Sequence, residues 1–152
     1  MKKLTHILFA ALLTLSAAGA AAAAPSDEYA GVVKTAKGSV VAERAGAQIP
    51  LSPGARVNQG DRIVTGADGY LGITMRDDTL LTLGPRGILA LDKYGFDPKT
   101  HDGNFLATLT RGVLSVVTGL IAKRSPDDFA VKTRISTMGV RGTEFIVEAN
   151  EL

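Results

Sequence analysis

Residues 62–91 of this 152-residue chain read RIVTGADGYLGITMRDDTLLTLGPRGILAL, and their pattern is that of β-strands. Leu71, Ile73 and Met75 fall on one face of an extended segment, with small or polar residues between them. An alternation with a period of two places one face of a strand in a core and the other in water. The stretch therefore predicts short strands joined by tight turns, with a hairpin at Asp68-Gly69, in a meander or in the stacked rungs of a β-roll.

The same punctuation by Gly, Pro, Asn and Asp runs through the rest of the chain, which is typical of all-β domains. No helical stripe of useful length interrupts it, and Gly119–Ser125 has room for one helical turn or a bend. The polar stretch Tyr94–Asn104 is interpreted as a hairpin extension or an insertion over one edge. We predict a single all-β domain over residues 31–149, built of about ten short strands. A compact β-roll or solenoid-like stack is the first expectation for its architecture, and a two-sheet β-sandwich is the second.

The N-terminus has the layout of a secretory signal peptide over residues 1–24. The positive pair Lys2-Lys3 precedes the apolar stretch Ile7–Leu15, and small residues then continue to Ala24. Cleavage is expected after Ala24, and residues 25–30 are expected to form a flexible lead. An uncleaved anchor is the alternative, because the apolar part is long enough to span a bilayer. An exported chain of this kind is expected in the periplasm or at the cell exterior, with no integral membrane segment after cleavage.

The charge balance argues against a nucleic-acid partner. The chain has 17 Lys and Arg against 15 Asp and Glu, and loss of Lys2 and Lys3 with the signal peptide leaves 15 of each. The arginines are scattered singly, whereas nucleic-acid binding needs a basic face. The sequence contains no cysteine, so it offers no disulfide, zinc–thiolate site or cysteine nucleophile. A domain of this length buries a working core without disulfides.

The closing motif, residues 139–145, is interpreted as a structural corner. Gly139 and Gly142 favour a tight bend, and Thr143 leads into the apolar strand that follows. The guanidinium of Arg141 is expected to bond the carbonyls of neighbouring turns or a nearby carboxylate. Presentation of Arg141 to a ligand carboxylate is the alternative.

A second corner is marked by Gly60-Asp61. Asp61 is expected to cap or close a turn through its own side chain, while Gly60 supplies the backbone angle that the turn needs. The alternative for this corner is a ligand-binding loop. As at the closing motif, the structural interpretation is the favoured one.

Carboxylates provide only weak candidates for chemistry. Asp97, Asp102 and Asn104 share a loop and offer oxygen ligands to calcium, although their spacing does not match an EF-hand and a solvated turn is the default. The pairs Asp77-Asp78 and Asp127-Asp128 are expected to point to opposite faces of a strand or into water, which does not suit acid–base catalysis. The lone histidine that remains after cleavage has no evident serine partner. We therefore predict no catalytic residue, no cofactor and, apart from the calcium candidate, no metal.

Five features of the chain match one family pattern. In chain order they are Gly38-Ser39-Val40 with Arg44-x-Gly46, the stretch Pro50–Gly66, the step Asp68–Thr79, a later hairpin formed by Arg111-Gly112 with Gly119–Lys123, and Gly139–Phe145. From about Gly31 to Val147 the chain resembles the FecR domain of bacterial envelope proteins. Two positions depart from the pattern: Asp78 stands where the family usually has glycine, and Arg134 where it often has proline. Aspartate tolerates left-handed backbone geometry better than most residues, so the first change suits a turn.

The resemblance implies a noncatalytic domain of the cell envelope. The leading hypothesis is a domain that binds a protein or glycan partner, with peptidoglycan among the glycans. The second is a signal-receiving module that relays ligand occupancy to a separate membrane regulator. The third is a hydrolase, which the missing triad and metal set disfavour. Because the chain ends soon after its closing strand begins, a further C-terminal strand or module is also expected.

Overall fold

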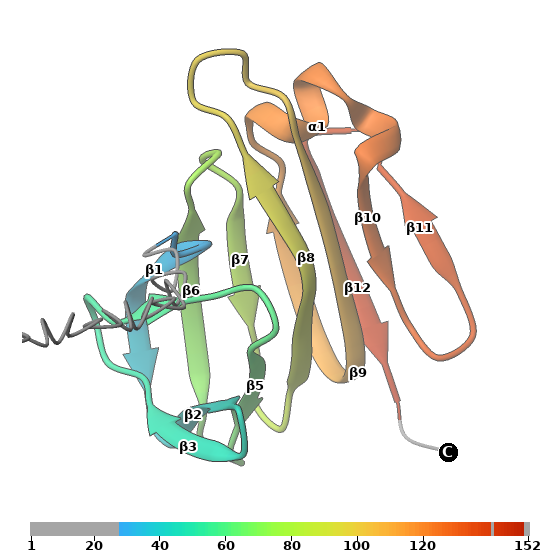
Figure 1. Ribbon diagram of the computed structural model, residues 1–152. Helices are drawn as coiled ribbons and strands as arrows, with labels where there is room; N and C mark the ends of the chain where they lie inside the picture. The colour runs from blue at the N-terminus through green and yellow to red at the C-terminus, as the bar shows by residue number, and fades with distance from the viewer. Residues whose placement is uncertain (1–27, 141, 151–152) are drawn as a thin grey trace, which may run out of the picture.

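The structure is a computed structural model that describes residues 28–140 and 142–150 (Figure 1). In chain order the elements are β1 (Gly31–Lys37), β2 (Val40–Arg44), β3 (Ala47–Pro50), β4 (Arg56–Val57), β5 (Arg62–Thr65), β6 (Tyr70–Met75), β7 (Leu80–Leu83), β8 (Ile88–Phe96), β9 (Gly103–Val117), α1 (Leu120–Arg124), the 3-10 turn Pro126–Asp128, β10 (Phe129–Lys132), β11 (Thr137–Gly139) and β12 (Glu144–Ala149). The predicted all-β class is confirmed. In this part of the chain, no helix is long and apolar enough to cross a membrane. The expected signal peptide lies outside the described residues.

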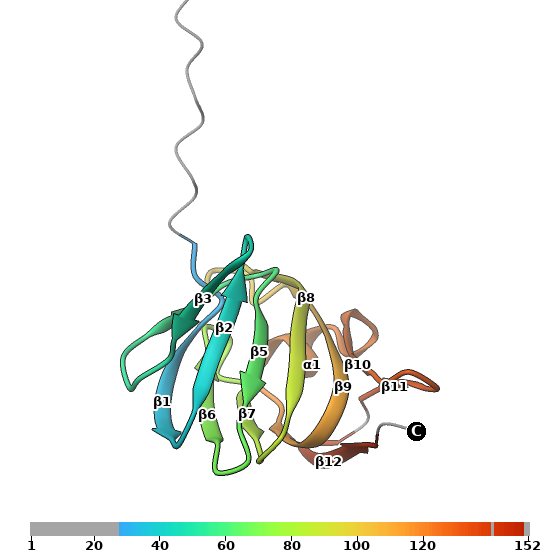
Figure 2. The same ribbon diagram turned by 90° about the horizontal axis from the view of Figure 1, so that it is seen from below.

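The strands form one curled sheet, a half-barrel whose two halves face each other across the core (Figure 2). The order is β3-β2-β5-β8-β9-β7-β6-β1-β4, with β10, β11 and β12 extending from β9. We call β2, β3, β5, β8, β10, β11 and the first part of β9 the front half, and β1, β4, β6, β7, β12 and the last part of β9 the back half. Among the described strands, only the β9–β10 pair is parallel. The solenoid-like stack is therefore not confirmed.

The core lies between the two halves, and alternation fills it from both sides. Leu71, Ile73 and Met75 of β6 are at most 3% exposed, as their spacing predicted. Phe105 of β9 and Phe129 of β10 stack with ring centroids 4.3 Å apart, and both rings are buried. Burial of these apolar side chains is the main source of the fold's stability.

Strand β9 links the two halves and bends sharply between them. Figure 1 shows it descending on the near side, bending at its lower end and rising on the far side. Its first part pairs with β8 and β10, and its last part pairs with β7 and β12. At the bend, Gly112 has φ of 99°, and a Cβ there would lie 2.7 Å from the Cα of Gly87. Arg111-Gly112 therefore bends one long strand that passes from one half to the other. The sequence interpretation had implied a hairpin here, in which two strands pair with each other.

The Asp68-Gly69 corner is also not a hairpin, so this prediction was wrong. Strand β5 pairs with β2 and β8 in the front half, whereas β6 pairs with β1 and β7 in the back half. At this corner the chain passes from one half to the other and runs close to Ser39. The Ser39 N–H donates to the Asp68 carboxylate at 3.3 Å. A Cβ at Gly69 would lie 2.6 Å from the Ser39 carbonyl oxygen, so the close crossing requires glycine there.

Two other connections match their predictions. The stretch Tyr94–Asn104 is a hairpin extension, in which β8 and β9 pair up to Phe96 and Gly103 and leave residues 97–102 as the loop. Gly119–Ser125 contains one helical turn, α1, which begins the crossover from β9 to the parallel strand β10.

Residues 28–30 of the expected flexible lead are attached to the sheet. Ala30 is 1% exposed, and its N–H donates to the Val57 carbonyl at 2.8 Å. Glu28 pairs with Arg76 at 2.7 Å, and the guanidinium of Arg56 lies 4.8 Å from the centre of the Tyr29 ring. Residues 28–30 are thus held against the sheet although they precede its first strand.

Candidate functional site

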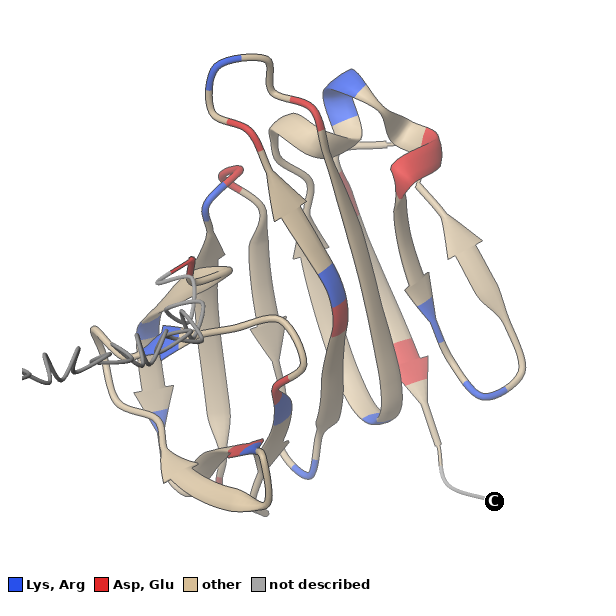
Figure 3. Cartoon of the chain, in the orientation of Figure 1, with Lys and Arg blue, Asp and Glu red and all other residues tan. Residues whose placement is uncertain are grey.

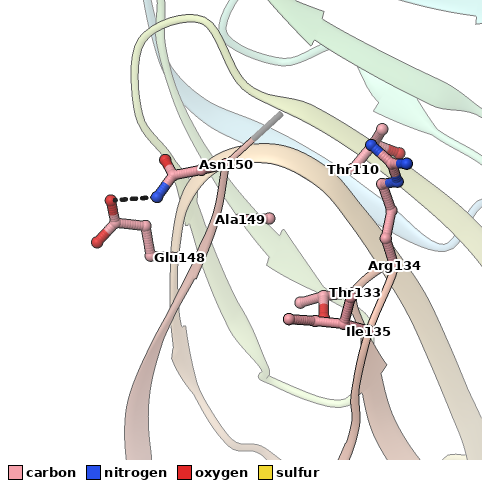
Figure 4. A pocket seen from close by; sticks show the side chains of 7 residues that line it. All are labelled: Thr110, Thr133, Arg134, Ile135, Glu148, Ala149 and Asn150. Atoms are coloured by element: carbon pink, nitrogen blue, oxygen red, sulfur yellow. Dashed lines mark hydrogen bonds between the residues drawn. The ribbon is translucent and has the colours of Figure 1, made fainter. Parts of the chain in front are cut away.

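The half-barrel is open between the β10–β11 hairpin and β12, and a cleft lies in this opening. Strand β10 borders the first part of β9 and β12 borders its last part, so the two strands diverge at the bend of β9. The cleft has a volume of about 310 Å³ (Figure 4). Its lining residues are Thr110 of β9, Thr133, Arg134 and Ile135 of the β10–β11 turn, and Glu148, Ala149 and Asn150 at the end of β12.

The β10–β11 turn is rigid and presents two side chains at the cleft. The Thr133 N–H donates to the Ser136 carbonyl at 2.8 Å, and the Ser136 N–H donates to Thr133 Oγ1 at 3.2 Å. Between these bonds, Ile135 is 91% exposed. Arg134 is also exposed and has no hydrogen-bond partner among the described residues. Figure 4 shows Arg134 extending toward Thr110.

The opposite wall of the cleft belongs to β12. Ala149 is buried, and Glu148 accepts a long 3.4 Å hydrogen bond from Asn150 Nδ2 (Figure 4). The cleft thus combines one guanidinium, one carboxylate, two apolar side chains, two hydroxyls and an amide, without a histidine or a pair of carboxylates among its lining residues. Such a set can recognise a carboxylate beside an apolar group. It holds no nucleophile paired with a base.

Asp61, from the second glycine-marked corner, is engaged with the scaffold. The carboxylate is fully buried and accepts two hydrogen bonds of 2.7 Å from the Arg44 guanidinium. It also accepts the Asn58 N–H at 2.8 Å, which closes a turn in which Gly60 has φ of 88°. Hydrogen bonding to Asp61 raises the pKa of Arg44. The sequence interpretation foresaw a turn closed by Asp61 but not its arginine partner, 17 residues away.

The closing motif lies between β11 and β12. Gly139 ends β11, and Gly142 has φ of 149°. Thr118, at the end of β9, holds the bend, because its N–H donates to the Thr143 carbonyl at 2.8 Å and its Oγ1 donates to the Gly142 carbonyl at 3.1 Å. A smaller cleft of about 220 Å³ lies beside these residues. Arg141 lies outside the described residues, so its expected role stays a prediction.

The calcium candidates have other partners. The Asp97 carboxylate accepts the Lys99 N–H at 2.8 Å, and Asp102 pairs with Arg124 at 3.3 Å. Asn104 lies on β9, opposite Gly95. In the part of the chain that the structure describes, no three acidic or histidine side chains gather as a metal site.

None of the remaining candidates lines the cleft. His101 stacks on Phe96 at the tip of the β8–β9 hairpin, with ring centroids 6.3 Å apart. Asp127 and Asp128 are exposed in the 3-10 turn. Asp78 is exposed and left-handed, with φ of 65°, as its place in the family pattern implied.

Asp77 is the residue that the sequence interpretation missed. The side chains of Asp77 and Asp78 were expected to point to opposite faces of a strand or into water, and that of Asp77 is fully buried. Its carboxylate accepts hydrogen bonds from Thr79 Oγ1 at 2.7 Å, Tyr94 Oη at 3.1 Å and the Ile121 N–H at 3.4 Å. The Asp77 carbonyl also accepts the Leu120 N–H at 2.7 Å. This network ties the β6–β7 turn to β8 and to the start of α1, so its role is structural.

The buried phenol of Tyr94 makes stability depend on alkaline pH. Burial, and then the Asp77 carboxylate, raise the pKa of Tyr94. An unfolded tyrosine releases its proton near pH 10, whereas the folded one retains it, so the stabilisation is present below about pH 10 and is lost as the pH rises above it. In urea denaturation at successive pH values, we expect the free energy of unfolding to fall more steeply above about pH 10 for the wild type than for Tyr94→Phe. Parallel profiles would contradict this assignment.

Comparison with known proteins identifies the family. Residues 61–151 match the family described as FecR protein. Since the match covers more than half of the chain, the chain belongs to the FecR family. The matched segment begins at Asp61, so β1–β4 lie outside it, although β1 and β2 pair with β6 and β5 of the matched part. No curated protein matches.

One solved structure is similar to part of the chain. It is described as "Cell surface anchoring domain" and is 26% identical. The alignment covers 40% of this chain and 82% of that one, with a TM-score of 0.39. A TM-score of this size does not define a shared fold.

Proposed function

We propose that the protein is a noncatalytic module of the cell envelope that binds a protein partner through the cleft between the β10–β11 turn and β12. The main support is that Ile135 and Arg134 lie side by side on a hydrogen-bonded turn at the cleft. Ile135 is exposed, and Arg134 has no partner among the residues that the structure describes. A rigid turn loses little conformational entropy on binding. Arginine and an apolar anchor are side chains that contribute strongly at protein interfaces.

The cleft chemistry favours a protein segment over a glycan. Its lining includes no aromatic ring on which a sugar could stack. The guanidinium of Arg134 suits a carboxylate, and Ile135 suits an apolar side chain next to that carboxylate. Membership of the FecR family supports an envelope location and a noncatalytic role. No particular contact favours the signal-relay hypothesis over simple binding.

Site-specific crosslinking at position 135 tests this function. A photoreactive residue at this position, in protein incubated with envelope extract, is expected to give one discrete crosslinked protein. Arg134→Ser should reduce its yield by about tenfold. The melting temperature should not change, because Arg134 is exposed and has no bond within the described fold.

Two controls make the outcome decisive. Ile146→Ser alters another exposed isoleucine, on the outer face of β12, and is expected to leave the crosslink at position 135 unchanged. Co-sedimentation with purified peptidoglycan is expected to recover no protein above background. Sedimentation that depends on Arg134, without a protein crosslink, would replace the protein partner with a glycan.

A further inference from the structure

The outer face of the back half is a broad sheet surface that no other part of the described chain covers. We call it the back face. Strand pairing arranges its outward residues in rows that cross the strands. The first row is Arg56–Val32–Thr74–Leu80–Val117–Glu144, the second is Thr35–Gly72–Thr82–Ser115–Ile146, and the third joins Lys37–Tyr70 at one side to Val113–Glu148 at the other. All these residues are exposed or half-buried, while their neighbours along β6, β7 and β9 are buried.

The middle of the back face is apolar and uncharged. Ile146 is 69% exposed, Leu80 44% and Val113 42%, and hydroxyl residues and glycine fill the positions between them. The front half differs, because its outer residues include the ion pair Glu43–Arg62 and charged positions on β8. Figure 3 shows the contrast, with charge on β5 and β8 and uncoloured ribbon along most of β6 and β7. An uncharged sheet surface with several exposed apolar side chains is a candidate interaction site.

The two margins of the back face carry opposite charge. At the β1 margin stand Lys34 and Lys37, both exposed. At the β12 margin stand Glu144 and Glu148, also exposed and on the same side of the strand as Ile146. The apolar band of β6, β7 and β9 lies between the lysines and the glutamates. The face is therefore self-complementary, because a half-turn about an axis parallel to the strands places the acidic margin of one copy over the basic margin of another.

We propose that the back face binds a second copy of this chain, giving a two-fold symmetric dimer of stacked sheets. A two-fold axis along the strands keeps each row opposite the same row of the second copy. Lys37 then faces Glu148 in the third row on both sides of the axis, with Tyr70 and Val113 between them. Stacked twisted sheets align within about 30° of one another, which preserves this register.

The size of the face is compatible with a weak dimer. Six strands spaced about 4.8 Å apart and three rows spaced about 6.8 Å apart give roughly 500 Å² on each copy. The two copies together bury about 1,000 Å², which is the lower end for a specific interface. Interfaces of this size are typical of weak, transient association, so we expect a concentration-dependent dimer that is sensitive to salt at its charged margins.

Sedimentation velocity of the purified protein from about 5 to 500 µM tests the proposal. The wild type is expected to shift from monomer to dimer with concentration. Leu80→Asp should raise the dissociation constant by at least about tenfold, because it places a charge on β7, the central strand of the face, close to the same residue of the second copy. Ile135→Asp is the matched control: it also puts aspartate in place of an exposed aliphatic side chain, but in the cleft, and should leave the dimer unchanged.

Charge reversal gives the sharper test. Lys37→Glu and Glu148→Lys should each weaken self-association, and a mixture of the two single variants or the double variant should restore it. Lys37, Leu80 and Glu148 are all exposed, so the variants should keep the wild-type circular dichroism spectrum and melting temperature. A monomer at every concentration would overturn the proposal. So would a dimer that resists Leu80→Asp, or charge reversals that weaken it without mutual rescue. Leu80 and Lys37 do not line the cleft, so their variants test the dimer independently of crosslinking at position 135, whereas Glu148 lines both surfaces.

Discussion

Replacing Asp77 with alanine is expected to destabilise the folded protein by about 3–5 kcal/mol, the largest effect we expect from any single polar side chain. The carboxylate is fully buried and accepts hydrogen bonds from Thr79, Tyr94 and the Ile121 N–H. Alanine removes the shared acceptor of all three donors. A buried donor without an acceptor loses its full solvation, at about 1–3 kcal/mol each, before any local rearrangement.

The surrounding backbone limits how far the structure can relax. The β6–β7 turn contacts the start of α1 so closely that a Cβ at Gly119 would overlap the Asp77 carbonyl oxygen. The Gly119 N–H donates to Thr79 Oγ1 at 3.0 Å, so the threonine bridges the turn and the helix. Water therefore has little room to replace the carboxylate as acceptor.

Urea denaturation of the wild type, Asp77→Ala and Asp78→Gly measures the effect. Asp78 is the matched neighbour: it is exposed, has φ of 65°, and occupies a position where glycine is at least as suitable. We expect Asp78→Gly to stay within about 1 kcal/mol of the wild type. Equal destabilisation by the two substitutions would show that the turn, and not the buried carboxylate, carries the stability.

Asp77 also shows where the sequence stops being informative. Its side-chain partners lie 17 and 44 residues away at Tyr94 and Ile121, and an Asp-Asp-Thr turn looks the same whether its first carboxylate is buried or wet. The left-handed geometry of Asp78 could be predicted, because backbone preferences act within a few residues. Burial of a polar group depends on which distant strands pack over it.

In the same way, the sequence predicts which side of a strand is buried but not which strands pair. The alternation of Leu71, Ile73 and Met75 was sufficient to predict the core-facing side of β6. The turn chemistry of Asp68-Gly69 was not sufficient to predict its pairing, since a tight turn can join neighbouring strands or carry the chain from one half to the other. The cleft depends on three segments that meet at the bend of β9, and no local pattern predicts such a meeting.

Removing the Arg44 guanidinium with Arg44→Met is expected to destabilise the protein by about 3 kcal/mol, more than removing the charge of its partner. Arg44 spans β2 and the Gly60-Asp61 corner, with both of its short bonds to the buried carboxylate at 2.7 Å. Methionine fills much of the volume of the arginine stem but leaves the carboxylate without a counter-ion. An unpaired buried charge is less favourable than the absence of the pair.

The double variant separates the free energy of the Arg44–Asp61 interaction from the contributions of the individual side chains. Asp61→Asn should cost about 1–2 kcal/mol, because the amide keeps an acceptor for the Asn58 N–H and leaves Arg44 partly in water. Added to Arg44→Met, the same change should recover part of the lost stability, since the buried charge is then gone. Such a coupling is the signature of a pair in direct contact.

Arg62→Met is the matched control for this cycle. Arg62 bonds Glu43 at 2.6 Å on the same two strands, β5 and β2, but both side chains are more than a third exposed. Exposed pairs of this kind contribute little, so we expect a change within about 0.5 kcal/mol. Urea denaturation of the five proteins at neutral pH measures all these differences together. If Arg44→Met were as mild as Arg62→Met, the buried pair would not hold the corner, and the ligand-loop interpretation of Gly60-Asp61 would become the better one.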